Sequence, residues 1–369
     1  MSSRSNMVIS LVIIAIIFGG VGFAIYFAAP YEPSRVAVVM MAPGFGDMSK
    51  ADNVYEGMDT LAHDVSVQYV YPDPLPTTVA EAQDDLEEYA SRANFYDLII
   101  AIGEDMIPAL QSVATDFPNQ KFAIIGGDVS LDNVASATFE SQEAAFLAGV
   151  VAAFMADEQR DSIDAPYNAQ IGILGAVDDN EINVLINGFI QGVISANETY
   201  DLNVTLVDTQ YVGYWNNSDV AEGMIYTMFV VDDISVIFAP VRASYEGVRT
   251  GMFRADQAFG FSSRQPLVIA AEGNLDWYGA ANPEIPIAPS FITTSAYDRM
   301  DWAIYDIINQ TLWDLFPGGE LLEYNLANGG SNITDFLYSS TYIPEELEDA
   351  LDLYREQISD GTIIVTRDL

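Results

Sequence analysis

Residues 96–155 read YDLIIAIGEDMIPALQSVATDFPNQKFAIIGGDVSLDNVASATFESQEAAFLAGVVAAFM, and this stretch decides the fold. Its first apolar run, Asp97–Gly103, ends in glycine. Its second apolar run, Phe122–Ile125, is followed by Gly126 and Gly127. Short, continuously apolar runs of this kind are typical of strands that are buried on both faces of a parallel sheet.

The segments between and after these runs favour helices. Met106, Leu110, Val113 and Phe117 recur at helical spacing, which predicts an amphipathic helix between the two strands. After a further extended run at 134–139, a serine and an acid open an alanine- and glycine-rich helix. The alternation of strand and helix predicts a parallel sheet.

Working outward, a first series of strands and helices starts at Val36 and a second starts at Ala169. Two series of similar size in a chain of 369 residues predict an α/β protein with two doubly wound lobes and a ligand cleft between them. We further expect a polar surface loop at 157–166 and a terminal strand at 362–366.

The segments YDLIIAIG, KFAIIGG and NVASATF-x-x-x-EAAFLAG carry a resemblance to a known family. They resemble the core of the basic membrane protein family, which comprises substrate-binding receptors of ABC transporters and includes purine nucleoside receptors. The similarity extends from about Val36 to about Thr311. It implies a fold of the periplasmic-binding-protein type, with residues 36–139 and 293–322 in lobe one and residues 140–292 and 323–369 in lobe two.

The N-terminal residues predict a membrane anchor. Residues 7–29 carry no charge and are long enough to span a bilayer, so we expect a transmembrane helix there. Residues 1–6, with Arg4, would form a cytoplasmic tip, and residues 30–35 a stiff linker. The alternative is a signal peptide cleaved near Ala28-Ala29-Pro30. The bulk of the chain is therefore predicted to lie outside the cell membrane.

Charge and residue usage exclude several functions. The chain has 54 acidic residues against 13 lysines and arginines, a net charge of −41, which excludes nucleic acid as a partner. It has no cysteine, so disulfides and thiolate chemistry are excluded, and a lipid-modified cysteine cannot anchor it. Hydrolase motifs such as GxSxG and HExxH are missing, so neither catalysis nor a cofactor or metal is expected.

Ligands of doubly wound sheets bind at loops beyond the carboxyl ends of the strands. Loops at 44–53, 103–106, 126–129, 211–217, 239–245, 271–274 and 294–298 have that position. In one of them Trp215 offers an aromatic face for stacking, although packing in a lobe core is the alternative. In another, Arg242 can clamp a carboxylate or phosphate, or it can pair with Asp298 and only close the site.

The resemblance assigns roles to matching positions. Asp47 and Ser49 match the family's Asp-x-Ser loop, while Lys50 takes the place of a stacking phenylalanine. Trp215, followed by Asn216, matches a second stacking aromatic. Glu272 matches an aspartate that holds ribose hydroxyls; the alternatives for Glu272 and Lys50 are solvated surface side chains. The predicted ligand-binding residues are therefore Asp47, Ser49, Lys50, Trp215, Asn216, Arg242, Glu272 and Asp298.

The sequence thus predicts an extracytoplasmic receptor that delivers a small polar ligand, with a nucleoside as the leading candidate, to an ABC permease. Four residues depart from the family's pattern, namely Lys50, Gly126, Arg242 and Asp298, so a ligand with an anionic group is a second hypothesis. A third is a membrane-anchored sensory or structural surface ectodomain that binds no ligand.

Overall fold

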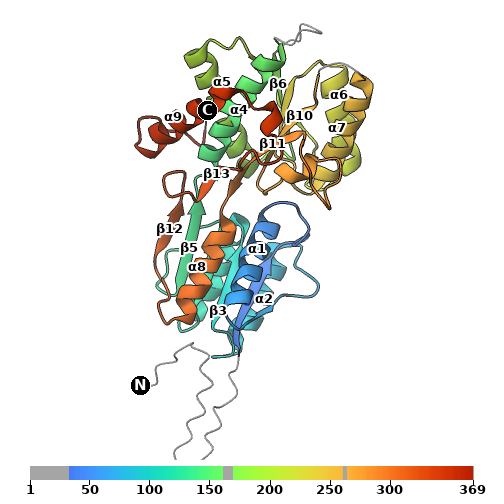
Figure 1. Ribbon diagram of the computed structural model, residues 1–369. Coiled ribbons are helices and arrows are strands. Elements are labelled where there is room, and N and C mark those ends of the chain that lie inside the picture. Colours follow the sequence, from blue (N-terminus) through green and yellow to red (C-terminus); the bar gives the residue numbers. More distant parts are fainter. Residues whose placement is uncertain (1–32, 161–168, 261–263, 369) are drawn as a thin grey trace, which may run out of the picture. The chain divides into compact units, whose positions relative to one another are not determined.

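The computed structural model describes residues 33–160, 169–260 and 264–368 (Figure 1). The chain forms two compact units. The first comprises the described residues up to Met41 together with Met58–Ser136 and Ile304–Leu321. The second comprises Ala42–Gly57, Ala137–Ala303 and Leu322–Leu369. The sequence-based boundaries place residues 42–57, 137–139, 293–303 and 322 in lobe one, whereas these residues fall in the second unit.

The predicted anchor at 7–29, the tip at 1–6 and most of the linker lie outside the described residues. Within the described ranges, no helix combines the length and the apolar character that crossing a membrane requires.

The first unit is built on a six-stranded sheet. Its strand order is β12 (Leu321–Tyr324), β5 (Val134–Phe139), β4 (Phe122–Ile125), β3 (Leu98–Ile102), β1 (Ser34–Met40) and β2 (Val67–Val70). The pairs β1–β2, β1–β3 and β3–β4 are parallel, and every residue of β3 and β4 is buried. The two apolar runs of the opening stretch therefore form β3 and β4, two parallel strands in the middle of this sheet, as predicted.

Helices cover this sheet. α2 (Val79–Ser91) and α3 (Ile107–Asp116) bury Leu86, Leu110 and Val113 against alternate residues of β1 and β3. α1 (Lys50–Asp64) and α8 (Met300–Leu312) also belong in part to this unit. Thr78 caps α2 by accepting the amide of Glu81 at 3.2 Å, which explains where that helix begins.

The second unit has a larger sheet. The strand order is β13 (Ser331–Ile333), β11 (Ile292–Asp298), β10 (Leu267–Ala271), β9 (Val236–Ala239), β6 (Gln170–Gly175) and β7 (Thr205–Leu206), and β8 (Gln210–Tyr211) also pairs with β6. β13 runs antiparallel to β11, whereas the other pairs are parallel.

Side chains of β10 alternate between two cores. Ile269 and Ala271 join the core under α4 (Ser141–Arg160), α5 (Asn180–Tyr200) and α9 (Glu345–Ser359). Val268 and Ala270 join the core under α6 (Ser218–Val230) and α7 (Tyr245–Phe259). The sheet is thus buried on both faces, which requires the unbroken apolar runs seen in the sequence.

Glycines allow α4 and α5 to pack closely. A Cβ at Gly149 would lie 2.1 Å from the Phe189 carbonyl oxygen, and one at Gly192 would lie 1.9 Å from that of Phe146. Neither position tolerates a side chain unless the two backbones move apart. The glycine that ends the EAAFLAG segment is therefore a helix-packing residue.

Two local predictions are wrong. Residues 157–160 continue helix α4, so the predicted loop at 157–166 starts too early, and residues 161–166 lie outside the described residues. Residues 362–366 form no strand. Val365 is buried in the α4–α5–α9 core, but Gln191 of α5 bonds both the amide and the carbonyl oxygen of Thr366. The Gln191 side chain thus supplies the hydrogen bonds that a neighbouring strand would have made to Thr366.

Candidate ligand-binding site

Four charged side chains meet in the second unit at the carboxyl ends of its strands. Glu181 lies in the first turn of α5, after β6. Arg242 lies in a short 3₁₀ turn after β9, and Glu272 directly follows β10. Lys50 is the first residue of α1. We call these four residues the charge cluster.

The pair Arg242–Glu272 is the centre of the charge cluster. The Arg242 Nε lies 2.9 and 3.1 Å from the two Glu272 carboxylate oxygens, and Nη2 lies 2.8 Å from Oε1. This fork geometry suits a guanidinium and a carboxylate better than any other ion pair. Because only 4% of the Glu272 side chain is exposed, the alternative of a solvated surface carboxylate is wrong.

Three further contacts complete the charge cluster. Arg242 Nη2 also donates to Glu181 Oε2, and Lys50 Nζ lies 3.3 Å from Glu181 and 3.6 Å from Glu272. Lys50 is one-quarter exposed, so it is a cluster member and not a solvated surface lysine. Two cations and two carboxylates alternate, and the charge cluster has no net charge.

Trp215 lies against the charge cluster. The Arg242 guanidinium stacks over the Trp215 ring, 4.2 Å from its centroid, in a cation–π contact. The indole remains 36% exposed and is therefore available from solvent. Trp215 is thus a loop residue of the site, and the alternative of packing in a lobe core is wrong.

The backbone is strained at both members of the Arg242–Glu272 pair. Arg242 has φ +48° and Glu272 has φ +67°, the left-handed region that side-chain-bearing residues rarely adopt. Each such residue costs on the order of 1 kcal/mol and is kept where the surroundings demand it. The fold therefore keeps the backbone of both ion-pair members in a strained conformation.

The charges are stabilised by one another. Burial opposes ionisation of Glu181, but Lys50 and Arg242 together lower its pKa to about 2. Burial likewise disfavours the charged guanidinium, yet Glu272 and Glu181 raise the pKa of Arg242 above its ordinary value. Glu181 and Arg242 therefore both stay ionised at neutral pH.

The 44–53 loop supports the charge cluster from α1. Asp47 accepts the amides of Ser49 at 2.8 Å and Ala51 at 3.3 Å, so it orders the start of the helix. Burial raises the pKa of Asp47 to about 6 despite these bonds. The buried Ser49 hydroxyl has no hydrogen-bond partner in the described residues, and Asn53 donates to the Glu272 carbonyl oxygen at 2.8 Å.

Asp298 and Asn216 lie outside the charge cluster. Asp298 is buried and accepts the hydroxyls of Ser141 at 2.6 Å and Ser331 at 2.7 Å. Burial raises its pKa, and the two serine hydroxyls offset part of the increase. The predicted alternative of an Arg242–Asp298 pair is wrong, because Arg242 binds Glu272 and Glu181. Asn216 is exposed beside Trp215.

The structure therefore brings together Lys50, Trp215, Arg242 and Glu272 of the predicted residues, with Asp47 and Ser49 in the adjoining turn. Sequence reasoning missed Glu181. It lies in the first turn of α5, after the loop that follows β6, so the strand-end rule applied to the segment 176–181 would have included it. Within the described ranges, no group of three or more metal-binding side chains converges.

An α/β fold with two units also occurs in a solved protein of known class. A solved solute-binding protein of an ABC transporter system from Aeropyrum pernix K1 shares this fold with a TM-score of 0.76. The match covers 91% of this chain and 94% of that one at 22% identity.

The sequence profile of the Bmp family, described as ABC transporter substrate-binding protein PnrA-like, matches residues 34–366. The chain belongs to this family, which confirms the resemblance inferred from the sequence. The ABC transporter nucleoside-binding protein BmpA of Lactococcus lactis is 27% identical over 343 residues, 90% of this chain and 88% of the relative. Basic membrane protein A of Borreliella burgdorferi is 24% identical over 328 residues, 87% and 84% of the two chains.

Proposed function

We propose that this protein is the receptor of an ABC transporter and that it captures a nucleoside at Trp215 and Glu272. One observation carries the proposal. A single guanidinium, that of Arg242, contacts both the Trp215 ring and the Glu272 carboxylate. The aromatic face and the carboxylate are therefore close enough to be bound by one small molecule.

A nucleoside carries the two groups that this pair of residues can bind. Its base is a flat aromatic surface that stacks on an indole. Its ribose has two neighbouring hydroxyls, and a carboxylate accepts hydrogen bonds from both. The charge cluster has no net charge, which suits an uncharged ligand. To bind in this way, the nucleoside displaces Arg242 from the ring of Trp215 and shares Glu272 with it.

The two cations support a second candidate. Lys50 and Arg242 both lie within ion-pair distance of Glu272, so a ligand that displaces either one also meets a free cation. An acidic group on the ligand, a carboxylate or a phosphate, would pair with that cation. A nucleoside monophosphate combines this acidic group with the base and the diol.

Calorimetric titration of the full-length chain distinguishes these candidates. Adenosine, 2′,3′-dideoxyadenosine and adenosine 5′-monophosphate differ only in the diol and in the phosphate. For a nucleoside receptor, we expect the dideoxy compound to bind at least about tenfold more weakly than adenosine, because Glu272 loses two charge-assisted hydrogen bonds. Tighter binding of the monophosphate supports the second candidate. Equal binding of adenosine and its dideoxy analogue contradicts the role of Glu272.

A control variant isolates the stacking role of Trp215. Trp215→Leu keeps an apolar side chain but removes the ring, and we expect it to weaken adenosine binding by about tenfold. Trp313→Leu, on a half-exposed tryptophan of the first unit, serves as the matched control and leaves binding unchanged.

Location and partner belong to the same proposal. Curated relatives include an uncharacterized lipoprotein of Pyrococcus abyssi, 25% identical over 318 residues, 85% of this chain and 72% of the relative. We infer that this chain also works outside the cytoplasm, held by residues 7–29 in place of a lipid, and passes its ligand to a membrane permease. If no nucleoside, nucleotide or small acid binds, the alternative of a surface ectodomain without a ligand is favoured instead.

A further inference from the structure

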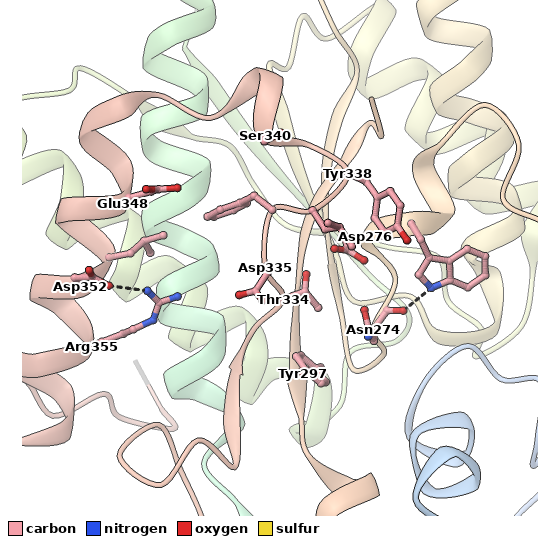
Figure 2. A pocket seen from close by; sticks show the side chains of 14 residues that line it. Asn274, Asp276, Tyr297, Thr334, Asp335, Tyr338, Ser340, Glu348, Asp352 and Arg355 are labelled. Carbon is pink, nitrogen blue, oxygen red and sulfur yellow. Dashed lines mark hydrogen bonds and ion pairs between the residues drawn. The ribbon is translucent and has the colours of Figure 1, made fainter. Parts of the chain in front are cut away.

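A second concave site lies in the second unit, at the side of the sheet that helix α9 covers. It is a cavity of about 720 Å³ bounded by α9, by the segment 334–340 and by the turn 274–277 after β10. We call it the α9 pocket. Figure 2 shows Asp276, Thr334 and Tyr338 on one side of this pocket and Glu348, Asp352 and Arg355 of α9 on the other. Its volume lies in the range of small-molecule sites. It shares no residue with the charge cluster.

The α9 pocket is lined by more acidic side chains than its single arginine can neutralise. Four carboxylates and one guanidinium line it. The guanidinium, Arg355, lies 3.1 Å from Asp352, so that pair is neutral. The other three acids form no ion pair with any lysine, arginine or histidine of the described residues; they are Asp276, Asp335 and Glu348.

Asp276 is the acid that points to a ligand. It is 95% buried in a position where Figure 2 shows its carboxylate directed into the pocket, and no side-chain donor or cation of the described residues binds it. Burial, with a contribution from the nearby Asp335, raises the pKa of Asp276 to about 6, and the Trp277 amide offsets part of this increase. A buried carboxylate in this state gains more from a positive partner than a solvated one does.

Aromatic rings form much of the remaining wall: Trp277, Tyr297, Phe336 and Tyr338. The faces of such rings attract cations, and their area binds apolar groups. A metal ion does not fit, because the described residues contain no converging group of metal ligands.

We propose that the α9 pocket binds a small organic cation, whose protonated amine pairs with Asp276 and whose apolar body packs against the rings. No covalent step is involved. The ligand class is that of primary or secondary amines with a ring or a short branched chain. This site is additional to the receptor function proposed above and does not depend on it.

Titration of the full-length chain with benzylammonium chloride tests the proposal, and benzyl alcohol is the uncharged analogue of the same size. We expect benzylammonium to bind at least about tenfold more tightly than benzyl alcohol, because only the cation can pair with Asp276. Asp276→Asn, which keeps the shape of the side chain, should lower the benzylammonium affinity by about tenfold. It should leave the affinity for benzyl alcohol unchanged.

Two controls separate the α9 pocket from attraction to the whole acidic surface. Asp232→Asn removes an exposed acid outside the pocket, and we expect it to leave benzylammonium binding unchanged. Asp335→Asn changes an exposed acid of the pocket, so it tests the site even where Asp276→Asn does not fold. Equal affinities for benzylammonium and benzyl alcohol overturn the proposal. An unchanged benzylammonium affinity in both pocket variants overturns it as well.

Discussion

Two acids that follow the same strand have opposite surroundings. Glu272 and Asp276 both come after β10, four positions apart, and they are 6% and 5% exposed. Glu272 is bound by Arg242 and faces Lys50 at 3.6 Å. Asp276 has no cation partner in the part of the chain that the structure describes, and the nearby Asp335, which also lines the α9 pocket, repels its charge.

The difference shows that burial alone does not define a binding site. A buried carboxylate that is already paired keeps its charge, so its ligand must compete with the paired cation and offer hydrogen bonds in return. A buried carboxylate without a cation is costly when ionised, so a ligand that supplies the positive charge is favoured. The same loop thus presents one site for a neutral or partly anionic ligand and another for a cation.

The largest expected effect follows from removing the cation of Glu272. Arg242→Met keeps the length of the side chain but leaves Glu272 buried with only Lys50 nearby. We expect the free energy of unfolding to fall by about 4 kcal/mol, measured by chemical denaturation at pH 7. Arg254→Met is the matched control, because its pair with Glu222 is half-exposed and is worth about 0.5 kcal/mol. Equal losses in the two variants would show that the charge cluster is not a strongly coupled site.

The second-largest expected effect is a loss of folding stability at acid pH, and it depends on Glu181. Its pKa is about 2 in the folded protein and 4.5 in the unfolded chain. Because the pKa of Glu181 is lower in the folded protein, its ionisation stabilises the fold at every pH above the unfolded pKa. This stabilisation is lost as the pH falls from about 4.5 towards 2. Between pH 5 and pH 2.5, we expect the wild type to lose about 2 kcal/mol more than Glu181→Gln does. Glu284→Gln, on an exposed acid, should follow the wild type.

Asp276 has a smaller and opposite effect, because acidification increases the stability of the fold through this residue. Its pKa is about 6 in the folded protein against 3.8 unfolded, so protonation stabilises the fold, and stability is lost as the pH rises through 6. From pH 7 to pH 5 this group should add about 1 kcal/mol to the free energy of unfolding, an increment that Asp276→Asn abolishes. Asp47 adds a similar increment in the same range, so Asp47→Asn is measured alongside. If the free energy of unfolding of Asp276→Asn changes with pH as that of the wild type does, Asp276 is not a buried carboxylate without a cation, and it does not differ from Glu272 as described.

Much of the fold was predictable because parallel strands buried on both faces need unbroken apolar runs. Phe122–Ile125 and Val134–Phe139 were predicted at the bounds that the structure has. The run at 362–366 is also apolar, and its sequence does not reveal that Gln191, far away in the chain, satisfies its backbone. The short strands β12 and β13 were missed for a related reason, since only their partners β5 and β11 define them.

The candidate site was predictable in part. The strand-end rule and the family resemblance together pointed to Lys50, Trp215, Arg242 and Glu272, which the structure brings together. Which acid pairs with which base could not be read from the chain, because the partners are 30 or more positions apart. No pattern in the sequence predicted the α9 pocket. Its walls come from the turn after β10, from the segment after β13 and from α9, and only the folded chain brings them together.

The most direct test of the account combines two ligands with two proteins. Adenosine and 2′,3′-dideoxyadenosine are titrated calorimetrically into the full-length wild type and into Glu272→Gln, each first shown to be folded by its melting transition. We predict that the wild type prefers adenosine by at least about tenfold and that this preference disappears in the variant. A preference that survives in Glu272→Gln, or one that is missing in the wild type, would contradict the assignment of Glu272 to the ribose diol.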